Sequence, residues 1–194
     1  MQTFDAVLCD LDGVVRRFDH DRQRRIEARY GLPVLATAFA PELIGPAILG
    51  RTTATQWLAG IAEALGGHPE AVQATAEFAD VDFWVDRPVA DLLTRVRTRM
   101  PLILVTNAMD NLDDHLTRLR LTGFADAVIS SAVVGIAKPD PGIYEIAAEA
   151  AGVPPRRCLF IDDRLDNVAA ARALGMTGIH FHDIDDLAVL RAGA

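Results

Sequence analysis

The chain has 194 residues, of which 51% are hydrophobic and 24% charged, a composition typical of a globular protein and not of a disordered one. Its formal net charge of −8 repels a nucleic-acid backbone and an anionic membrane, so neither is expected as a partner. Cysteine occurs twice, at Cys9 and Cys158, inside apolar runs, which predicts buried thiols in a reducing compartment.

The sequence contains no recognisable export or membrane signal. Residues 1–5 lack the basic start and the apolar run of a signal peptide. The longest weakly charged stretch, residues 31–50, is interrupted by three prolines and by Glu42, so it is no membrane span. We therefore expect a cytoplasmic protein, and the sequence carries no signal for its oligomeric state.

Short apolar runs alternate with helical patterns along most of the chain. The runs predict buried parallel strands at 6–9, 102–105, 127–129 and 158–161, with a weaker fifth at 177–181. Helical patterns lie between them, at about 88–99, 110–121, 140–151 and 165–174. This alternation predicts an α/β fold built on a doubly wound parallel sheet.

Residues 16–87 interrupt this alternation, because they contain no convincing strand and only helical patterns such as 54–65 and 69–78. An interval of that length is too long for an ordinary strand–helix connection. We interpret it as a small α-helical cap domain inserted after the first strand. The predicted division is a core of residues 1–15 and 88–194 with a cap at 16–87.

Polar residues at the ends of the predicted strands are the candidates for chemistry, because ligands of open α/β sheets bind outside the carboxyl ends of the strands. These residues are Asp10 and Asp12 after the first strand, Thr106 and Asn107 after the second, Lys138 beyond the third, and Asp162 and Asp163 after the fourth. Asp–x–Asp pairs also occur at 19/21, 80/82 and 183/185, so the pair alone is a weak signal. What distinguishes Asp10 and Asp12 is the apolar run directly before them.

Several carboxylates buried at one sheet edge are costly unless a cation neutralises them. A hard cation with oxygen ligands, Mg²⁺, is therefore the expected cofactor. The ionised carboxylate of Asp10 is the candidate nucleophile, and Asp12 is the candidate general acid and base. Thr106, the backbone N–H of Asn107 and the ammonium of Lys138 are the candidates to bind the phosphoryl oxygens.

Basic residues give two further signals. Lys138 is the one lysine among 19 basic residues, which suggests that a compact ammonium is required there and a guanidinium is not. Arg16 and Arg17 closely follow the candidate nucleophile. They either contact an anionic substrate or lie on a solvated helix face, and Arg16 is the candidate substrate-binding residue.

Four segments resemble the four motifs of the haloacid dehalogenase superfamily, in the family's order and spacing. They are residues 10–14 (DLDGV), 106–107 (TN), 138–141 (KPDP) and 161–167 (IDDRLDN). The resemblance implies a Rossmann-like core with a small helical cap of the type that closes over small substrates. It also implies Mg²⁺ held by Asp10, the carbonyl of Asp12, Asp162 and Asp163, with Asn167 in support.

The expected function is a Mg²⁺-dependent phosphatase, a phosphoric monoester hydrolase that acts on a small phosphorylated metabolite through an aspartyl-phosphate. Asp12 favours phosphate chemistry, because the dehalogenases that this chain resembles need neither a second aspartate nor a metal. The absence of a lysine from residues 16–87 argues against a phosphonate-cleaving enzyme that uses a Schiff base. A metal-independent 2-haloacid dehalogenase, a phosphomutase and a catalytically silent binding protein of the same fold stay open as alternatives.

Overall fold

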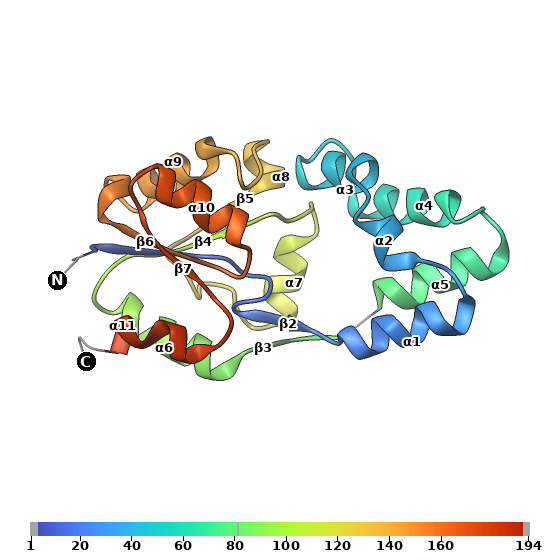
Figure 1. Ribbon diagram of the computed structural model, residues 1–194, viewed down its shortest axis with the longest axis horizontal. Coiled ribbons are helices and arrows are strands. Elements are labelled where there is room, and N and C mark those ends of the chain that lie inside the picture. Colours follow the sequence, from blue (N-terminus) through green and yellow to red (C-terminus); the bar gives the residue numbers. More distant parts are fainter. Residues whose placement is uncertain (1–3, 81, 192–194) are drawn as a thin grey trace.

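The computed structural model describes residues 4–80 and 82–191, so the expectation drawn from residues 1–5 lies partly outside it. Within these ranges, five strands form one parallel sheet in the order β5-β4-β1-β6-β7 (Figure 1). The strands are β1 (Ala6–Cys9), β4 (Leu102–Thr106), β5 (Ala127–Ser130), β6 (Cys158–Asp162) and β7 (Thr177–His180). The predicted α/β fold with a doubly wound parallel sheet is confirmed.

Both faces of the sheet are buried, which explains why its strands read as continuous apolar runs. On β1, Val7 and Cys9 belong to one hydrophobic cluster, and Ala6 and Leu8 belong to the other. The first cluster packs under α6 (Arg87–Arg97), α7 (Leu112–Arg118), the 3₁₀ helix η2 (Ile184–Leu187) and α11 (Ala188–Arg191). The second packs under α9 (Pro141–Ala150) and α10 (Leu165–Ala173). Figure 1 shows the sheet between these two helical layers.

Two short helical segments also belong to the core. They are α8 (Ser131–Val134), which directly follows β5, and the 3₁₀ helix η1 (Pro155–Arg157), which leads into β6.

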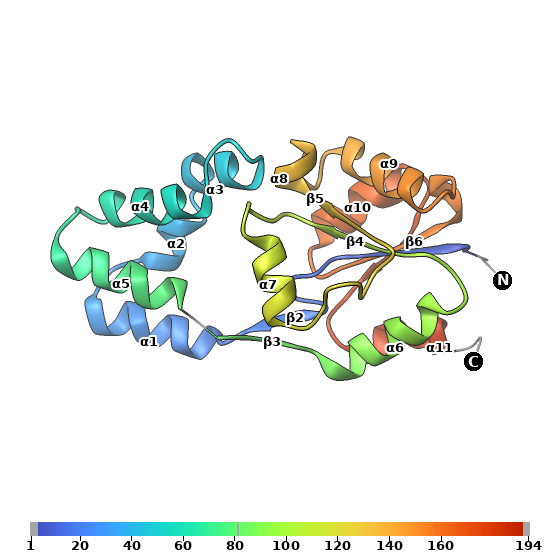
Figure 2. The ribbon, with the colours of Figure 1, turned by 180° about the vertical axis from the view of Figure 1, so that it is seen from behind.

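A helical insertion separates β1 from the rest of the sheet. It contains α1 (His20–Tyr30), α2 (Val34–Ala38), α3 (Pro41–Ile48), α4 (Ala54–Ala64) and α5 (Pro69–Ala79). Figures 1 and 2 show these helices as a body beside the sheet. The division at residues 16–87 stays a prediction, because the arrangement of the helices does not fix where a domain begins.

The insertion is joined to the core by a two-stranded antiparallel ribbon, β2 (Arg16–Phe18) and β3 (Phe83–Val85). The expectation of no strand in residues 16–87 is therefore wrong. Each strand is three residues long, too short for an alternating pattern, and each is defined by pairing with a segment more than 60 residues away in sequence, with Phe18 opposite Phe83.

The helical insertion has a hydrophobic core of its own, in which Ile26, Val34, Ala38, Ile61 and Ala74 are buried together. The indole N–H of Trp57 donates to the carbonyl of Ala38 at 2.9 Å, and its ring packs against Phe78. Trp57 therefore acts in packing within the insertion. None of the helices in the described residues is long and apolar enough to cross a bilayer.

The insertion also contacts the core away from the ribbon, where α3 lies beside α8 (Figure 2). The carboxylate of Asp110, in the loop after β4, accepts the backbone N–H of Ala54 at 2.8 Å, at the N-terminus of α4. Gly50 approaches the core so closely that an added Cβ would lie 2.3 Å from the carbonyl oxygen of Ala132. These contacts place the start of α4 next to the loop that follows Thr106.

Ile61→Ala should test how strongly the core of the insertion is packed. Ile61 is fully buried, and removing its side chain should lower the free energy of unfolding by about 2–5 kcal/mol. The measurement is urea unfolding followed by tryptophan fluorescence, to which Trp57 of this core contributes. Val72→Ala, at a position of the same insertion that is 53% exposed, is the matched control and should change stability by about 0.5 kcal/mol or less. An equal effect of both substitutions would contradict this packing.

Candidate active site

Asp10 lies at the carboxyl end of the central strand, directly after Cys9. Its backbone N–H continues the ladder to β6 by donating to Ile161 O at 2.8 Å. Its side chain is 7% exposed, and Oδ1 accepts the backbone N–H of Leu11 at 2.7 Å. The sheet therefore holds this carboxylate in one orientation at the edge where β1, β4 and β6 end.

Lys138 connects two of the strand ends. Its Nζ lies 2.8 Å from Asp10 Oδ1 and 2.7 Å from Asp162 Oδ2, and the side chain is buried. The side chain of Asn107 fastens the backbone of Lys138 through both of its polar atoms. Asn107 Oδ1 accepts the Lys138 N–H at 2.8 Å, and Asn107 Nδ2 donates to the Lys138 carbonyl at 2.9 Å. The carboxamide of Asn107 therefore positions Lys138, a role that its place in the sequence does not reveal.

Asp162 is fully buried and is surrounded by donors. In addition to its contact with Lys138, Oδ1 of Asp162 accepts a hydrogen bond from the backbone N–H of Arg164 at 2.8 Å. The side-chain amide Nδ2 of Asn167 lies 3.0 Å from Oδ1 and 3.1 Å from Oδ2 of Asp162 and donates to them. Buried carboxylates persist where such donors replace water.

Asp163 follows at the exposed rim, where it faces the loop after β1. Gly13 in that loop has φ of +78°, and a Cβ at this position would lie 2.0 Å from Asp163 Oδ2. The absence of a side chain at Gly13 therefore lets Asp163 approach the strand ends.

Asp10, Asp162 and Asp163 can each direct one carboxylate oxygen into a space where the three atoms lie within 4.8 Å of one another. Such a set of hard oxygen donors fits Mg²⁺. Burial raises the pKa of Asp10 well above its usual range, Lys138 opposes that rise, and Asp162 adds to it. Burial and then Asp162 also raise the pKa of Asp163. One ammonium among three carboxylates leaves a net negative charge, which a divalent cation would neutralise.

Lys138 itself stays protonated. Burial alone lowers its pKa, but the carboxylates of Asp10 and Asp162 outweigh burial, so the pKa ends above the ordinary value. The buried thiol of Cys9 is the opposite case, because burial, and next the charge of Asp10, raise its pKa well above the usual range. A thiol held in its protonated form is a poor nucleophile, which argues against Cys9 in that role.

Asp12 lies farther out, with its side chain 35% exposed. Both of its carboxylate oxygens are bound by Arg16, Oδ1 by Nε and Oδ2 by Nη2 at 2.8 Å. The remaining nitrogen of Arg16, Nη1, lies 3.0 Å from Nδ1 of His115 in α7. No sequence motif marks His115. It is recognised as part of this site only because it lies close to Arg16 in the structure.

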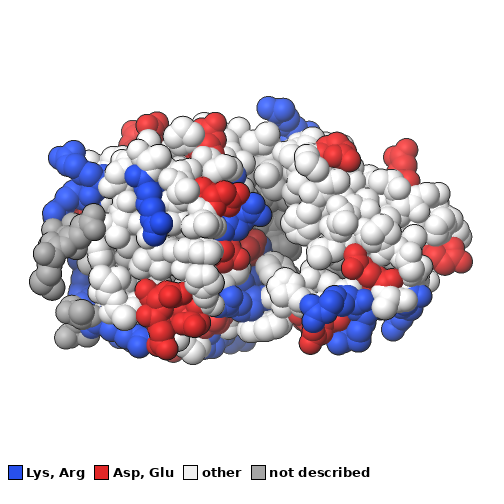
Figure 3. Space-filling view, viewed as in Figure 1, with Lys and Arg blue, Asp and Glu red and all other residues white. Residues whose placement is uncertain are grey.

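Thr106 ends β4 and is fully buried, and its hydroxyl oxygen has no hydrogen-bond partner within the described residues. A buried hydroxyl of this kind is available to the oxygen of a ligand. In Figure 3 a furrow separates the core from the helical insertion, and charged side chains border it on the core side.

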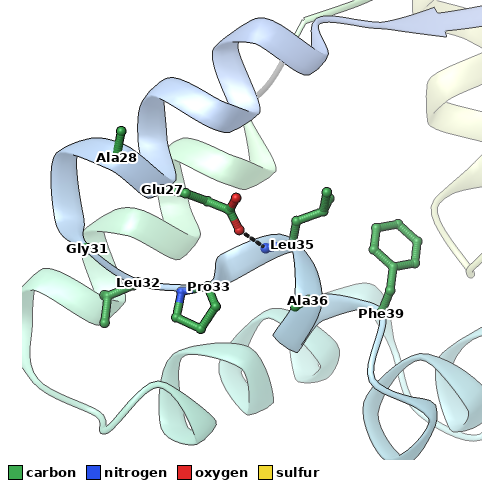
Figure 4. A pocket seen from close by; sticks show the side chains of 8 residues that line it. All are labelled: Glu27, Ala28, Gly31, Leu32, Pro33, Leu35, Ala36 and Phe39. Carbon is green, nitrogen blue, oxygen red and sulfur yellow. Dashed lines mark hydrogen bonds between the residues drawn. The ribbon is translucent and has the colours of Figure 1, made fainter.

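A depression of about 810 Å³ lies elsewhere, on the helical insertion between α1 and α2 (Figure 4). Its lining is apolar apart from Glu27, whose carboxylate accepts the backbone N–H of Leu35 at 2.8 Å. No residue from the strand ends lines it, so it offers no group for the chemistry of the acidic cluster.

The chain matches the family described as haloacid dehalogenase-like hydrolases over residues 4–175. The match covers most of the chain, and the protein belongs to this family of hydrolases. The predicted family membership is confirmed.

Particular relatives extend this result. Phosphatase MT3486 of Mycobacterium tuberculosis is 30% identical over 185 residues, covering 90% of this chain and 85% of that protein. A phosphorylated carbohydrates phosphatase of Thermotoga maritima is 26% identical, covering 98% of this chain and 92% of that protein. The solved structure of a haloacid dehalogenase family enzyme, BT-2542 of Bacteroides thetaiotaomicron, in complex with magnesium and inorganic phosphate, has a TM-score of 0.77. It is 22% identical and covers 95% of this chain and 98% of its own, a likeness that concerns the fold.

Gly13→Ala should disturb the acidic cluster through Asp163. The new Cβ would occupy the position of the Asp163 carboxylate, so we expect affinity for Mg²⁺, measured by calorimetric titration, to fall at least about tenfold. Gly31→Ala is the matched control, because Gly31 also has a positive φ, of +65°, but nothing lies within 4 Å of its added Cβ. Both variants should lose about 1–2 kcal/mol of stability from backbone strain. Equal Mg²⁺ affinity in the two variants would show that Asp163 is not a ligand.

Proposed function

We propose that the protein is a phosphatase that hydrolyses the phosphoric monoester of a small metabolite, with Asp10 as nucleophile and Mg²⁺ as cofactor. The observation that carries the proposal is the buried group of Asp10, Asp162 and Lys138, with Asp163 at its rim, at one sheet edge. The names of two relatives that align over most of their length, both phosphatases, support the choice of phosphate as the reacting group.

The proposed reaction has two steps. In the first, a carboxylate oxygen of Asp10 attacks phosphorus, the bond from phosphorus to the ester oxygen breaks, and Asp12 donates a proton to that oxygen. In the second, water attacks the aspartyl-phosphate, Asp12 accepts a proton from the water, and inorganic phosphate leaves with the carboxylate of Asp10 restored.

Mg²⁺ would be held by Asp10, Asp162, Asp163 and the carbonyl of Asp12, and when bound it supplies positive charge for the phosphoryl oxygens. Lys138, the hydroxyl of Thr106 and the backbone N–H of Asn107 are the protein's own partners for those oxygens. Lys138 is suited to this because its ammonium already lies between Asp10 and Asp162, so it screens the incoming anion from both carboxylates.

The helical insertion, residues 16–87, is proposed as the cap that encloses the substrate. Its contacts to the core through Ala54 and Gly50 lie next to the loop after Thr106, which supports a place for the substrate between the two parts. The proposed substrate is a small phosphorylated metabolite of the cytoplasm, and no nucleic-acid or membrane partner is proposed.

The central experiment is hydrolysis of 4-nitrophenyl phosphate with Mg²⁺, with excess chelator, and by the Asp10→Asn variant. We expect chelator to abolish activity, and Asp10→Asn to abolish turnover without unfolding the protein, because an amide keeps the shape but is no nucleophile. Asp21→Asn is the control, since Asp21 is an exposed member of the Asp–x–Asp pair at 19/21 and the substitution should leave activity unchanged. Phosphoenzyme in the Asp10→Asn variant would contradict the nucleophile, and chelator-resistant release of halide from 2-haloacids would establish the dehalogenase alternative.

Lys138→Arg tests the proposed screening role. The substitution keeps the charge, but a planar guanidinium with a fixed fork does not fit the space between two carboxylates 2.8 and 2.7 Å from the present ammonium. We expect kcat/KM to fall at least about tenfold, equivalent to roughly 1.4 kcal/mol of transition-state stabilisation. Unchanged kcat/KM would show that Lys138 does not contact the phosphoryl group.

A further inference from the structure

Arg16 lies in β2, where the chain leaves the core for the helical insertion, and it is only 5% exposed. All three nitrogens of its guanidinium have partners. Nε and Nη2 bind the two oxygens of Asp12, and Nη1 meets the ring of His115. Each nitrogen of this buried guanidinium thus already has a partner within the protein, which favours a role toward Asp12 over the contact with a substrate anion that the sequence suggested for Arg16.

One aromatic ring from each strand of the ribbon lies against the guanidinium. Phe18 of β2 and Phe83 of β3 face each other, with ring centroids 6.2 Å apart. The guanidinium carbon of Arg16 lies 5.2 Å from the centroid of Phe18 and 5.4 Å from that of Phe83. Contacts of a cation with ring faces add to the attraction and restrict the rotamers of the arginine.

His115 completes the arrangement from the core side. Arginine has donors and no acceptor, so Nδ1 of His115 must carry the lone pair, and the ring proton is on Nε2. Burial, followed by the charge of Arg16, lowers the pKa of His115, which keeps the ring neutral and able to accept this bond. The ring also packs against Phe83, with centroids 4.9 Å apart. Arg16 is thus fixed by groups from β2, β3 and α7.

We propose that Arg16 is a positioning residue, which holds the carboxylate of Asp12 in the orientation needed for proton transfer to and from the reacting phosphate ester. The inference rests on the proposed function, in which Asp12 is the general acid and base. An exposed ion pair four residues apart is usually worth little, because long side chains lose entropy when they pair. Here burial has already removed the side-chain entropy of Arg16, so pairing costs little more. The planar guanidinium then holds both carboxylate oxygens of Asp12, whose side chain is partly exposed.

The test compares substrates that differ in how much protonation the leaving group needs. Arg16→Met should lower kcat/KM at least about tenfold for alkyl phosphates, whose leaving oxygen needs a proton, and less than about threefold for 4-nitrophenyl phosphate. Inhibition by inorganic phosphate should change less than about twofold, since Arg16 does not bind the phosphoryl group in this proposal. Arg16→Lys, which keeps charge without the fork, should show the same selective loss and replaces Arg16→Met if that variant does not fold.

Arg118→Met is the matched control. The guanidinium of Arg118 lies 4.7 Å from the centroid of the same Phe83 ring, but no contact with Asp12 is found in the described residues. Its loss should leave the dependence of rate on the leaving group unchanged. A selective loss as large as that of Arg16→Met would show that the effect arises from disturbance of the aromatic contacts and would overturn the proposal.

A double-mutant cycle separates this inference from the proposed function. If Arg16 acts only through Asp12, then Arg16→Met should have less than about a twofold effect in the Asp12→Asn background. Losses that multiply, or a weakened binding of phosphate that is equal for all leaving groups, would assign Arg16 a direct role with substrate and overturn the inference alone. An Asp12→Asn variant whose kcat/KM falls equally for all leaving groups would instead overturn the role of Asp12 as general acid, and the inference with it.

Discussion

The arrangement of the site depends on the concentration of negative charge at one edge of the sheet. Asp10 and Asp162 are both buried, and the ammonium of Lys138 lies within 2.8 Å of each. Carboxylates in such a place are stable only with donors and cations around them. The amide of Asn167, the N–H of Arg164 and the carboxamide of Asn107 that fastens Lys138 all serve this requirement, directly or through Lys138.

The sheet topology delivers these groups to one place. β1 and β6 are adjacent and parallel, so Asp10, directly after β1, and Asp162, the last residue of β6, lie at the same edge of the sheet. β4 flanks β1 on the other side and ends in Thr106, whose buried hydroxyl lacks a partner within the described residues. Because the strands are covered on both faces, this edge is the part of the sheet where polar groups reach the surface.

The connection between core and helical insertion is chemically part of the site. Arg16 belongs to β2 of the ribbon, and it binds Asp12, two residues after the nucleophilic candidate. Farther along, Gly50 and the N-terminus of α4 meet the core beside the loop after Thr106. The insertion is thus joined to the core at two separate places, through the ribbon and through the packing and hydrogen bond at the start of α4.

The sequence by itself was sufficient to predict the α/β class, the order of the core elements and the acidic residues at the strand ends. Each of these features produces a local pattern of residue types along the chain. Asp10 and Asp162 each adjoin an apolar run, and a parallel sheet brings such ends together whatever the details of packing. Lys138 was recognisable because no other lysine occurs in the chain. The family resemblance added the candidate metal ligands as a set.

Other features were decided by the tertiary structure alone. The strands β2 and β3 are too short to show an alternating pattern of apolar and polar residues. They are strands only because they pair with each other. The carboxamide of Asn107 serves Lys138, 31 residues away, and His115 reaches Arg16 across 99 residues. Contacts between side chains so distant along the chain leave no periodicity or spacing in the sequence, since they depend on how separate elements pack.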